Sequence, residues 1–273
     1  DRYFQIAPCF RDEDARADRS PGEFYQLDME MAFASQEDVF SIVEQVLPPV
    51  FEKYGIYKEA SKAPFVRIPY LEAMDKYGSD KPDLRIDLVL TDATEVMQGC
   101  GFAPFEGQTV KAIVVDDFTA TRKQIDAICA EVEVQTARKG FWFRVDENGE
   151  FVGGISKFLQ DRKEEVIKAL GLKNGDFVGL AAGKKLEAQK TAGVYRKLLG
   201  AASEKHMKKD CYEFCWIVDF PMYEIGEESG ELEFCHNPFS MPQGGMDALN
   251  NQDPLEILAY QYDLVCNGVE LSS

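Results

Sequence analysis

The chain has 273 residues, 45% of them hydrophobic, and its 30 Lys and Arg residues against 48 Asp and Glu residues give a formal net charge of −18. This length accommodates two domains of ordinary size with a real hydrophobic core. The sequence contains no apolar run long enough for a membrane span, and its first residues do not resemble a secretory signal. The negative charge argues against nonspecific binding of nucleic acid, because phosphate contacts need Lys and Arg.

The first 33 residues predict two strands joined by a highly charged loop. Gln26, Asp28 and Glu30 alternate along the second strand and therefore share one face, while Leu27 and Met29 lie on the other. Phe4, Ile6, Pro8 and Phe10 give the first strand an apolar face in the same way. Such a hairpin is either the floor of a site for a polar ligand or an ordinary solvated hairpin, and periodicity alone favours neither.

A helix is predicted next, from a capping box at Ser35 and Asp38 to about Gly55. Pro48 and Pro49 are expected to kink or interrupt it. A second, shorter element is predicted at residues 69–77.

From about residue 88 the pattern changes to alternating strands and helices. Strands are predicted at 109–115, 141–145 and 176–182, and helices at 121–139, with Gly140 past its end, at 160–171 and at 184–199. This alternation predicts an α/β insertion of common domain size. We find no reactive constellation in it, and Gly183 to Lys185 lack the spacing of a phosphate loop. Beyond it we expect a strand at 216–224, a turn at 226–230, a flexible loop at 241–253 and the beginning of a helix at 255–262.

The seven cysteines are odd in number and follow no framework spacing. This usage favours reduced thiols in a cytoplasmic protein. His206, Cys211 and Cys215 lie close together, but their intervals are not those of a CxxC site and the chain has only two histidines. The sequence therefore disfavours zinc binding.

Several stretches resemble one enzyme family. FRDEDARADR followed by EFYQLDMEMAF resembles the second signature motif of class II aminoacyl-tRNA synthetases, in the form found in the bacterial aspartyl group. YGSDKPDLR (77–85), WIVDFPMYE (216–224), HNPFS (236–240) and YDLVCNGVE (262–270) resemble further segments of that group in the same order. The resemblance covers nearly the whole chain and implies an α+β fold: part of the antiparallel class II sheet with flanking helices (1–87 and 207–273), interrupted by the α/β insertion (88–206).

The resemblance implies a ligase that joins L-aspartate to tRNA through an aspartyl-adenylate, with ATP and Mg²⁺ as cofactors. The implied partners are L-aspartate, the acceptor end of tRNA and a second copy of the parent chain, without a membrane. Activation brings a carboxylate to the α-phosphate of ATP, so the site needs a cation between two anions; Arg and Mg²⁺ meet that need. Catalysis then depends mainly on positioning and electrostatics.

Residue roles follow from motif position alone. Arg11 is the implied catalytic residue, holding the α-phosphate and the substrate carboxylate. The implied partners of ATP are Asp12, Glu13 on the adenine side, Ser20 and Glu270. The implied aspartate pocket consists of Arg11, Gln26, Asp28 and His236, with Glu30 in support behind it. Asp263 and Glu270 are the implied Mg²⁺ carboxylates, and Arg16 and Arg19 are candidates for tRNA contact.

The sequence also departs from the family pattern. Ser20 stands where many relatives have Gln, Gly22 looks like an additional loop residue, and Asn237 replaces the second His of His-His-Pro-Phe. Asp263 and Glu270 are an odd number of residues apart, so a straight strand would place them on opposite faces, and a bulge near Gly268 is expected to bring them together. The first and third family motifs are missing, so we expect a fragment that cannot charge tRNA by itself.

Two alternatives remain. One is an ammonia-dependent, asparagine-forming relative of the class II group, although such relatives normally lack the insertion. The other is a non-catalytic tRNA-binding module, in which the insertion is a folded spacer or faces tRNA. Whether the parent also charges asparagine tRNA stays open at this level, as does its oligomeric state.

Overall fold

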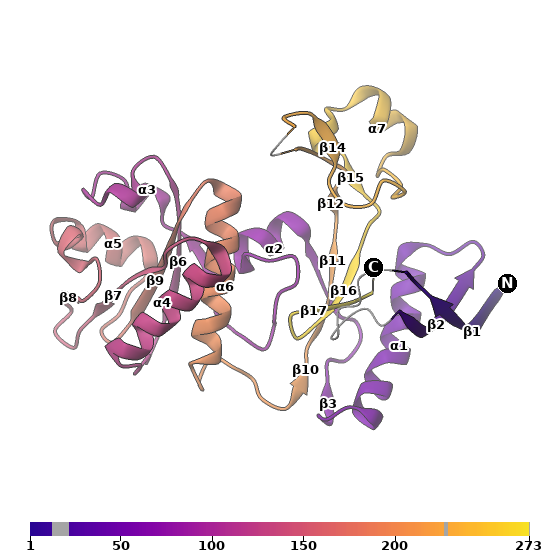
Figure 1. Cartoon of the computed structure of the whole chain (residues 1–273), viewed down its shortest axis with the longest axis horizontal. Helices are drawn as coiled ribbons and strands as arrows, with labels where there is room; N and C mark the ends of the chain where they lie inside the picture. Colours follow the sequence, from indigo (N-terminus) through magenta and orange to yellow (C-terminus); the bar gives the residue numbers. More distant parts are fainter. Residues whose placement is uncertain (13–21, 227–228, 273) are drawn as a thin grey trace. The chain divides into compact units, whose positions relative to one another are not determined.

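The computed structural model describes residues 1–12, 22–226 and 229–272 (Figure 1). Its contacts divide the chain into two units, Asp1–Pro49 and Val50–Ser273, each with its own internal packing. In the described part of the chain, no helix combines the length and the apolar character that crossing a bilayer requires.

The first unit is built on two antiparallel strands, β1 (Arg2–Phe10) and β2 (Glu23–Met31), as the alternation predicts. Helix α1 (Gln36–Tyr54) follows, and the backbone N–H and hydroxyl of Ser35 both donate to Asp38 at its start. This is the predicted capping pair. Pro48 and Pro49 lie inside α1, which continues to Tyr54 instead of being interrupted.

The second unit contains a five-stranded sheet in the order β5-β6-β9-β7-β8. Its strands are β5 (Leu90–Asp92), β6 (Thr109–Val115), β9 (Phe177–Gly183), β7 (Phe141–Val145) and β8 (Phe151–Val152). All four pairings are antiparallel. The alternation of strand and helix is thus observed, and the strands between the helices pair antiparallel.

Helices cover both faces of this sheet (Figure 1). Apolar residues of α4 (Arg122–Thr136) and α6 (Lys185–Ala201) pack in one cluster, and those of α3 (Thr94–Met97) and α5 (Lys163–Leu170) pack in the other. Burial on both sides explains why β6 and β9 are apolar almost throughout. Short 3₁₀ turns lie at Ala103–Phe105, Ser156–Phe158 and Gln160–Arg162.

The chain leaves this layered module beside the point where it entered. Ile86 and Met207 form an antiparallel bridge, the amide of Asp87 donates to the carbonyl of His206 (3.2 Å), and the amide of Lys208 donates to the carbonyl of Arg85 (2.9 Å). Adjacent ends are what an inserted segment requires. The boundaries at 88 and 206 nevertheless stay a prediction.

A second, mixed sheet has the order β17-β16-β11-β4. Its strands are β4 (Val66–Pro69), β11 (Phe214–Val218), β16 (Asp263–Cys266) and β17 (Val269–Ser272), and helix α2 (Tyr70–Tyr77) follows β4 directly. Smaller pairs join β3 (Glu59–Ala60) to β10 (Cys211–Tyr212), β12 (Phe220–Pro221) to β15 (Leu258–Ala259), and β13 (Tyr223–Ile225) to β14 (Leu232–Phe234).

Three local predictions are wrong. The predicted loop at 241–253 contains helix α7 (Gly245–Asn251), in which Asn251 donates to Asp247 one turn earlier (2.8 Å). The predicted helix at 255–262 is only the 3₁₀ turn Pro254–Glu256 followed by β15, because pairing with β12 and burial of Ile257 and Ala259 favour an extended chain. Helix α4 ends at Thr136, where Ala137 takes the left-handed conformation (φ 55°), before the expected Gly140.

Candidate functional site

In the first unit, one face of the β1–β2 hairpin is polar. Glu30 accepts a hydrogen bond from the hydroxyl of Tyr3 (2.6 Å), and Asp28 accepts one from Nε2 of Gln5 (3.0 Å). Gln26 lies on the same face, opposite Ala7. The shared face predicted for Gln26, Asp28 and Glu30 is therefore present. The apolar face is largely exposed, with Phe4 at 69% and Leu27 at 62%.

Arg11 lies at the end of β1, where its amide donates to the carbonyl of Gly22 (2.8 Å). Its guanidinium carbon is 5.5 Å from the centroid of the Phe24 ring, so the charged group leans over an aromatic face. Asp12 follows it as an exposed residue. Glu13, Arg16, Arg19 and Ser20 lie outside the described residues, and their predicted roles stay predictions.

In the second unit, Asp263 and Glu270 lie on the two strands of the β16–β17 hairpin. The turn consists of Asn267 (φ 51°) and Gly268 (φ 81°), and both positive angles fit the tight turn for which Asn-Gly is favoured. Val265 pairs with Glu270, and Asp263 precedes Val265 by two residues, so both carboxylates lie on one face. The expected bulge near Gly268 is wrong: the chain reverses there, and the irregularity lies between Leu264 and Val265.

The two carboxylates differ in their surroundings. Asp263 is 5% exposed, and its Oδ1 has no hydrogen-bond partner among the described residues. Burial, with the charge of Glu270 as a second cause, raises the pKa of Asp263 to about 7. Glu270 instead forms an ion pair with Lys81 (3.1 Å), which also contacts Asp80 (3.1 Å). Partial burial works against the charge of Lys81, but these carboxylates outweigh it and raise its pKa overall.

The buried oxygen of Asp263 makes this hairpin a suitable site for a magnesium ion. A buried carboxylate oxygen without a partner, next to a second carboxylate, is relieved by a divalent cation that attracts both charges. The described residues contain no cluster of three or more His, Cys, Asp or Glu side chains suited to a metal. Two carboxylates are still sufficient for Mg²⁺, which commonly completes its shell with waters and substrate phosphates.

His236 lies close to aromatic side chains of the same unit. Its ring centroid is 4.8 Å from that of Phe220 and 5.5 Å from that of Tyr70, in edge-on contact with both. Burial lowers the pKa of His236, which favours the neutral imidazole. Burial likewise raises the pKa of Tyr70 and of Cys235 to about 12, with the charge of Glu224 contributing in both cases.

The segment 78–88, which includes Lys81, is supported by helix α6. Arg196 is 2% exposed and donates to the carbonyls of Leu88 (2.5 Å), Ile86 (2.6 Å) and Asp83 (3.1 Å). Gly193 lies against Gly78 so closely that a Cβ on Gly193 would be 2.4 Å from the Gly78 carbonyl oxygen. The sequence suggested no role for Lys81 or Arg196; the YGSDKPDLR match was the one signal that pointed to this loop.

A buried charge also links α2 to the five-stranded sheet. Lys111 of β6 is 2% exposed and forms ion pairs with Asp75 of α2 (2.6 Å) and with Asp92 of β5 (3.2 Å). An ammonium group so deeply buried requires such partners. Lys111 and Arg196 therefore connect the layered module to the elements around Lys81 through buried polar contacts.

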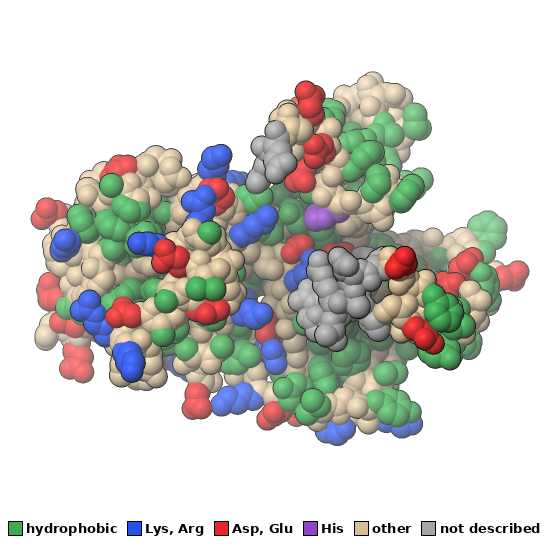
Figure 2. All heavy atoms as spheres, in the orientation of Figure 1, with side chains coloured by type: hydrophobic (Ala, Val, Ile, Leu, Met, Phe, Trp, Pro, Cys, Tyr) green, Lys and Arg blue, Asp and Glu red, His purple; other side chains and the backbone are tan. Residues whose placement is uncertain are grey.

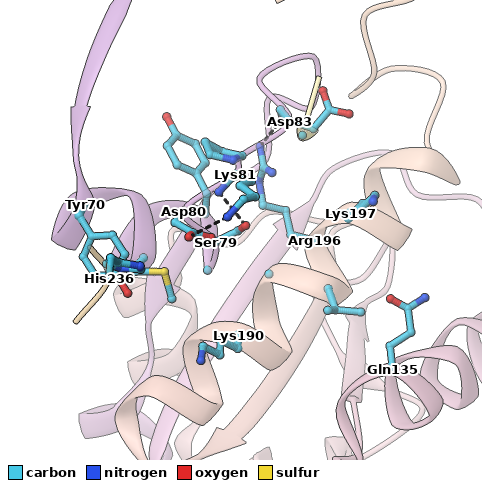
Figure 3. Close-up of a pocket in the computed structure, with 17 residues that line it drawn as sticks. Tyr70, Ser79, Asp80, Lys81, Asp83, Gln135, Lys190, Arg196, Lys197 and His236 are labelled. Atoms are coloured by element: carbon cyan, nitrogen blue, oxygen red, sulfur yellow. Dashed lines mark hydrogen bonds and ion pairs between the residues drawn. The ribbon is translucent and has the colours of Figure 1, made fainter. Parts of the chain in front are cut away.

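Between α2, the 78–83 loop and α6 lies a cavity of about 480 Å³ (Figure 3). Its lining includes Asp80 and Lys81 from the loop, Lys190 and Lys197 from α6, and His236. The space-filling view shows Lys and Arg side chains gathered along the region of α6 (Figure 2). The cavity therefore joins a basic helix surface to the loop that contacts Glu270.

The sequence disfavoured a zinc site at His206, Cys211 and Cys215, and the structure shows other contacts for His206. His206 lies between two carboxylates, with Nδ1 2.6 Å from Asp87 and Nε2 2.6 Å from Asp116. Cys211 and Cys215 are buried thiols. Both ring nitrogens of His206 are therefore within hydrogen-bond distance of a carboxylate.

Comparison with known proteins identifies the relatives of this chain. The family model for class II tRNA synthetases (D, K and N) matches residues 1–273. An aspartate–tRNA ligase of Streptomyces coelicolor is 54% identical over 275 residues, and one of Streptomyces avermitilis is 52% identical over 276 residues. An aspartate–tRNA(Asp/Asn) ligase of Rickettsia felis is 49% identical over 284 residues. The matches cover 100% of this chain but 46%, 46% and 47% of these relatives, so the chain spans about half their length.

Proposed function

Because the chain belongs to the class II tRNA synthetases (D, K and N), we propose that it serves in the ATP-dependent ligation of L-aspartate to tRNA. The names of its relatives support aspartate as the amino acid. The observation that favours the activation chemistry most is the β16–β17 hairpin. There, buried Asp263 has an oxygen without a hydrogen-bond partner among the described residues, and it shares a face with Glu270.

In the proposed reaction, a carboxylate oxygen of aspartate attacks the α-phosphorus of ATP. The new P–O bond forms as the bond to the bridging oxygen of the β-phosphate breaks, and pyrophosphate leaves. A ribose hydroxyl of tRNA then attacks the activated carbonyl and releases AMP. No protein nucleophile is required, so the side chains bind, orient and neutralise charge.

The residues divide these tasks according to their chemistry. Arg11 would hold the α-phosphate and the aspartate carboxylate through its planar guanidinium. Gln26 and Asp28 would line the aspartate pocket with His236, and Glu30, already bonded to Tyr3, would support it. Asp263 and Glu270 would hold Mg²⁺, with Glu270 also close to ATP. When bound, Mg²⁺ neutralises phosphate charge and stabilises the leaving pyrophosphate.

We also propose the organisation that goes with this function. Residues 88–206 would be an insertion into a class II catalytic domain formed by 1–87 and 207–273, which the adjacent ends at Ile86 and Met207 support. The cofactors would be ATP and Mg²⁺, the acceptor end of tRNA would be the RNA partner, and the working protein would be a cytoplasmic homodimer.

The proposal is tested by ligand-induced thermal stabilisation of this chain. A non-hydrolysable aspartyl-adenylate analogue at a hundredfold excess over its Kd is expected to stabilise the folded state by about 2.7 kcal/mol. Asparaginyl and lysyl analogues serve as specificity controls because the family model covers all three amino acids. Arg11→Ala is expected to abolish the shift, whereas Arg2→Ala on the same hairpin should retain it. A folded chain that prefers the asparaginyl or lysyl analogue, or that responds to none, would contradict the proposal.

A further inference from the structure

The cavity beside α6 contains two lysines on one face of the helix. Lys190 and Lys197 both line it and are seven residues apart (Figure 3). Seven residues make nearly two turns, so the two side chains start from the same side of the helix, with their Cα atoms about 10 Å apart along its axis. Neither lysine belongs to the groups discussed above for aspartate, ATP or magnesium.

These two lysines differ from the other cations of the cavity in their contacts. Lys81 is paired with Asp80 and Glu270, and the guanidinium of Arg196 bonds backbone carbonyls. The carboxylate of Asp83 is occupied by Arg85 (2.7 Å). Among the described residues, no carboxylate forms an ion pair with Lys190 or Lys197. The cavity thus has two cations available for a ligand, whereas its own acidic residues are occupied.

Lys190 and Lys197 are cations in a chain with a large negative net charge. The net charge of −18 opposes the approach of any anion. An anionic ligand therefore needs a local group of uncompensated cations, and the cavity provides one beside the loop that contacts Glu270. The charge of Lys190 also reaches Cys235, next to His236, where it counteracts the rise in thiol pKa.

We propose that this cavity binds phosphate groups, with Lys190 and Lys197 as the anchoring cations. This inference rests on the proposed function in one respect: that reaction brings phosphate to the protein as the polyphosphate of ATP, released as pyrophosphate, and as the phosphodiesters of the RNA substrate. The spacing of the lysines along α6 favours a ligand with several phosphates in a row over a single small anion. The single-stranded end of an RNA is the source that fits this spacing.

Isothermal titration of this chain with phosphate ligands tests the site without aspartate or an adenylate. The probes are a single-stranded RNA tetranucleotide, pyrophosphate, and adenosine as a ligand without phosphate. The test variant is Lys190→Gln with Lys197→Gln. Its matched control is Lys168→Gln with Lys185→Gln, which removes the same charge from exposed lysines of the same module that do not line the cavity.

The wild-type chain is expected to bind the tetranucleotide at low salt and not to bind adenosine. The cavity variant should bind it at least tenfold more weakly, and the slope of log Kd against log salt should fall by about 1.4, the loss expected for two single-strand phosphate contacts. The control variant should resemble wild type. Binding of pyrophosphate alone, lost in the same variant, would support the phosphate site and assign it to the released product. Absence of binding to both phosphate ligands, or equal weakening in both variants, would overturn the proposal. An adenylate analogue that binds while both phosphate ligands fail would overturn this site and leave the proposed function standing.

Discussion

The hairpins β1–β2 and β16–β17 both have candidate-site carboxylates on one face, and these carboxylates differ in burial. On β1–β2, Asp28 and Glu30 are near the surface and accept hydrogen bonds from the neutral donors Gln5 and Tyr3. On β16–β17, Asp263 is 5% exposed and one of its oxygens has no partner in the described part of the chain. The carboxylates of the first hairpin have hydrogen-bond donors from the same hairpin. The second hairpin has a buried carboxylate oxygen that a bound cation would stabilise. Alternation along β2 locates the first face, whereas the second face forms because the chain reverses at Asn267 and Gly268. Burial then distinguishes the chemistry of the two faces.

The largest effect on stability is expected from removing Arg196, which supports the 78–83 loop beside the β16–β17 hairpin. Arg196→Met should lower the free energy of unfolding by roughly 4 kcal/mol, because three buried carbonyls lose a charged donor. Chemical denaturation measures this loss. Arg122→Met removes an exposed arginine whose ion pair is 3.8 Å long, and it should change stability by less than about 0.5 kcal/mol. A similar small loss in both variants would mean that α6 does not hold the loop.

The contrast in burial predicts a pH-dependent effect at Asp263. Its pKa is about 7 when folded and 3.8 ordinarily, so the folded state binds the extra proton and loses relative stability as pH rises from about 4 to 7. Asp263→Asn should therefore be more stable than wild type at pH 8, by on the order of 3 kcal/mol, and should match it near pH 4.

Thermal unfolding from pH 4 to 8 measures this difference, and Asp28→Asn is the control on the exposed hairpin. That variant should not gain stability over wild type at pH 8, because Asp28 already accepts a hydrogen bond from Gln5. Mg²⁺ should raise the Tm of wild type at pH 8 and leave Asp263→Asn unchanged. Parallel pH profiles for wild type and Asp263→Asn would show that burial does not perturb this carboxyl.

A single methyl group should loosen the 78–83 loop. Gly193→Ala places Cβ 2.4 Å from the Gly78 carbonyl oxygen, a backbone atom, so α6 and the loop must separate at a cost of roughly 2 kcal/mol. Hydrogen exchange of the amides in 78–88 should become faster. Gly179→Ala is the matched control, because its Cβ meets Tyr195 (3.0 Å) and Leu199 (3.1 Å) inside the module and does not reach the loop. Equal exchange in the two variants would argue against a specific link between α6 and the loop.

The smallest effect is expected on the exposed hairpin. Tyr3→Phe removes the hydroxyl that donates to Glu30, and because both groups are at the surface the loss should be about 0.5 kcal/mol. Denaturant unfolding measures it, with Tyr25→Phe, a change on the other face of the same hairpin, as control. A loss above about 2 kcal/mol would show that polar groups on this exposed face contribute as much to the free energy of unfolding as those on the buried face.

Sequence patterns predicted regular elements best where both local signals and packing agreed. Thr109–Val115 and Phe141–Val145 were predicted to the residue because each is an apolar run bounded by turns that also became an interior strand of a covered sheet. The segment 241–262 was misjudged because its helix and strand are short, and pairing with β12 outweighs local preference. In the site, the polar face of Gln26, Asp28 and Glu30 was predicted from alternation, while Lys81, Arg196 and Lys111 received no role because their partners are distant in sequence.

Sequence patterns alone were enough to predict the two faces of the β1–β2 hairpin and the capping pair at Ser35 and Asp38. Periodicity and turn preferences are local properties, and they need no knowledge of what covers a face. Three further properties come from tertiary contacts: Asp263 is buried, Glu270 pairs with Lys81, and Lys190 and Lys197 line a cavity without an ion pair in the described residues. These properties depend on burial and on contacts between residues far apart in the chain, because the pKa of a group and its need for a ligand are set by everything packed around it.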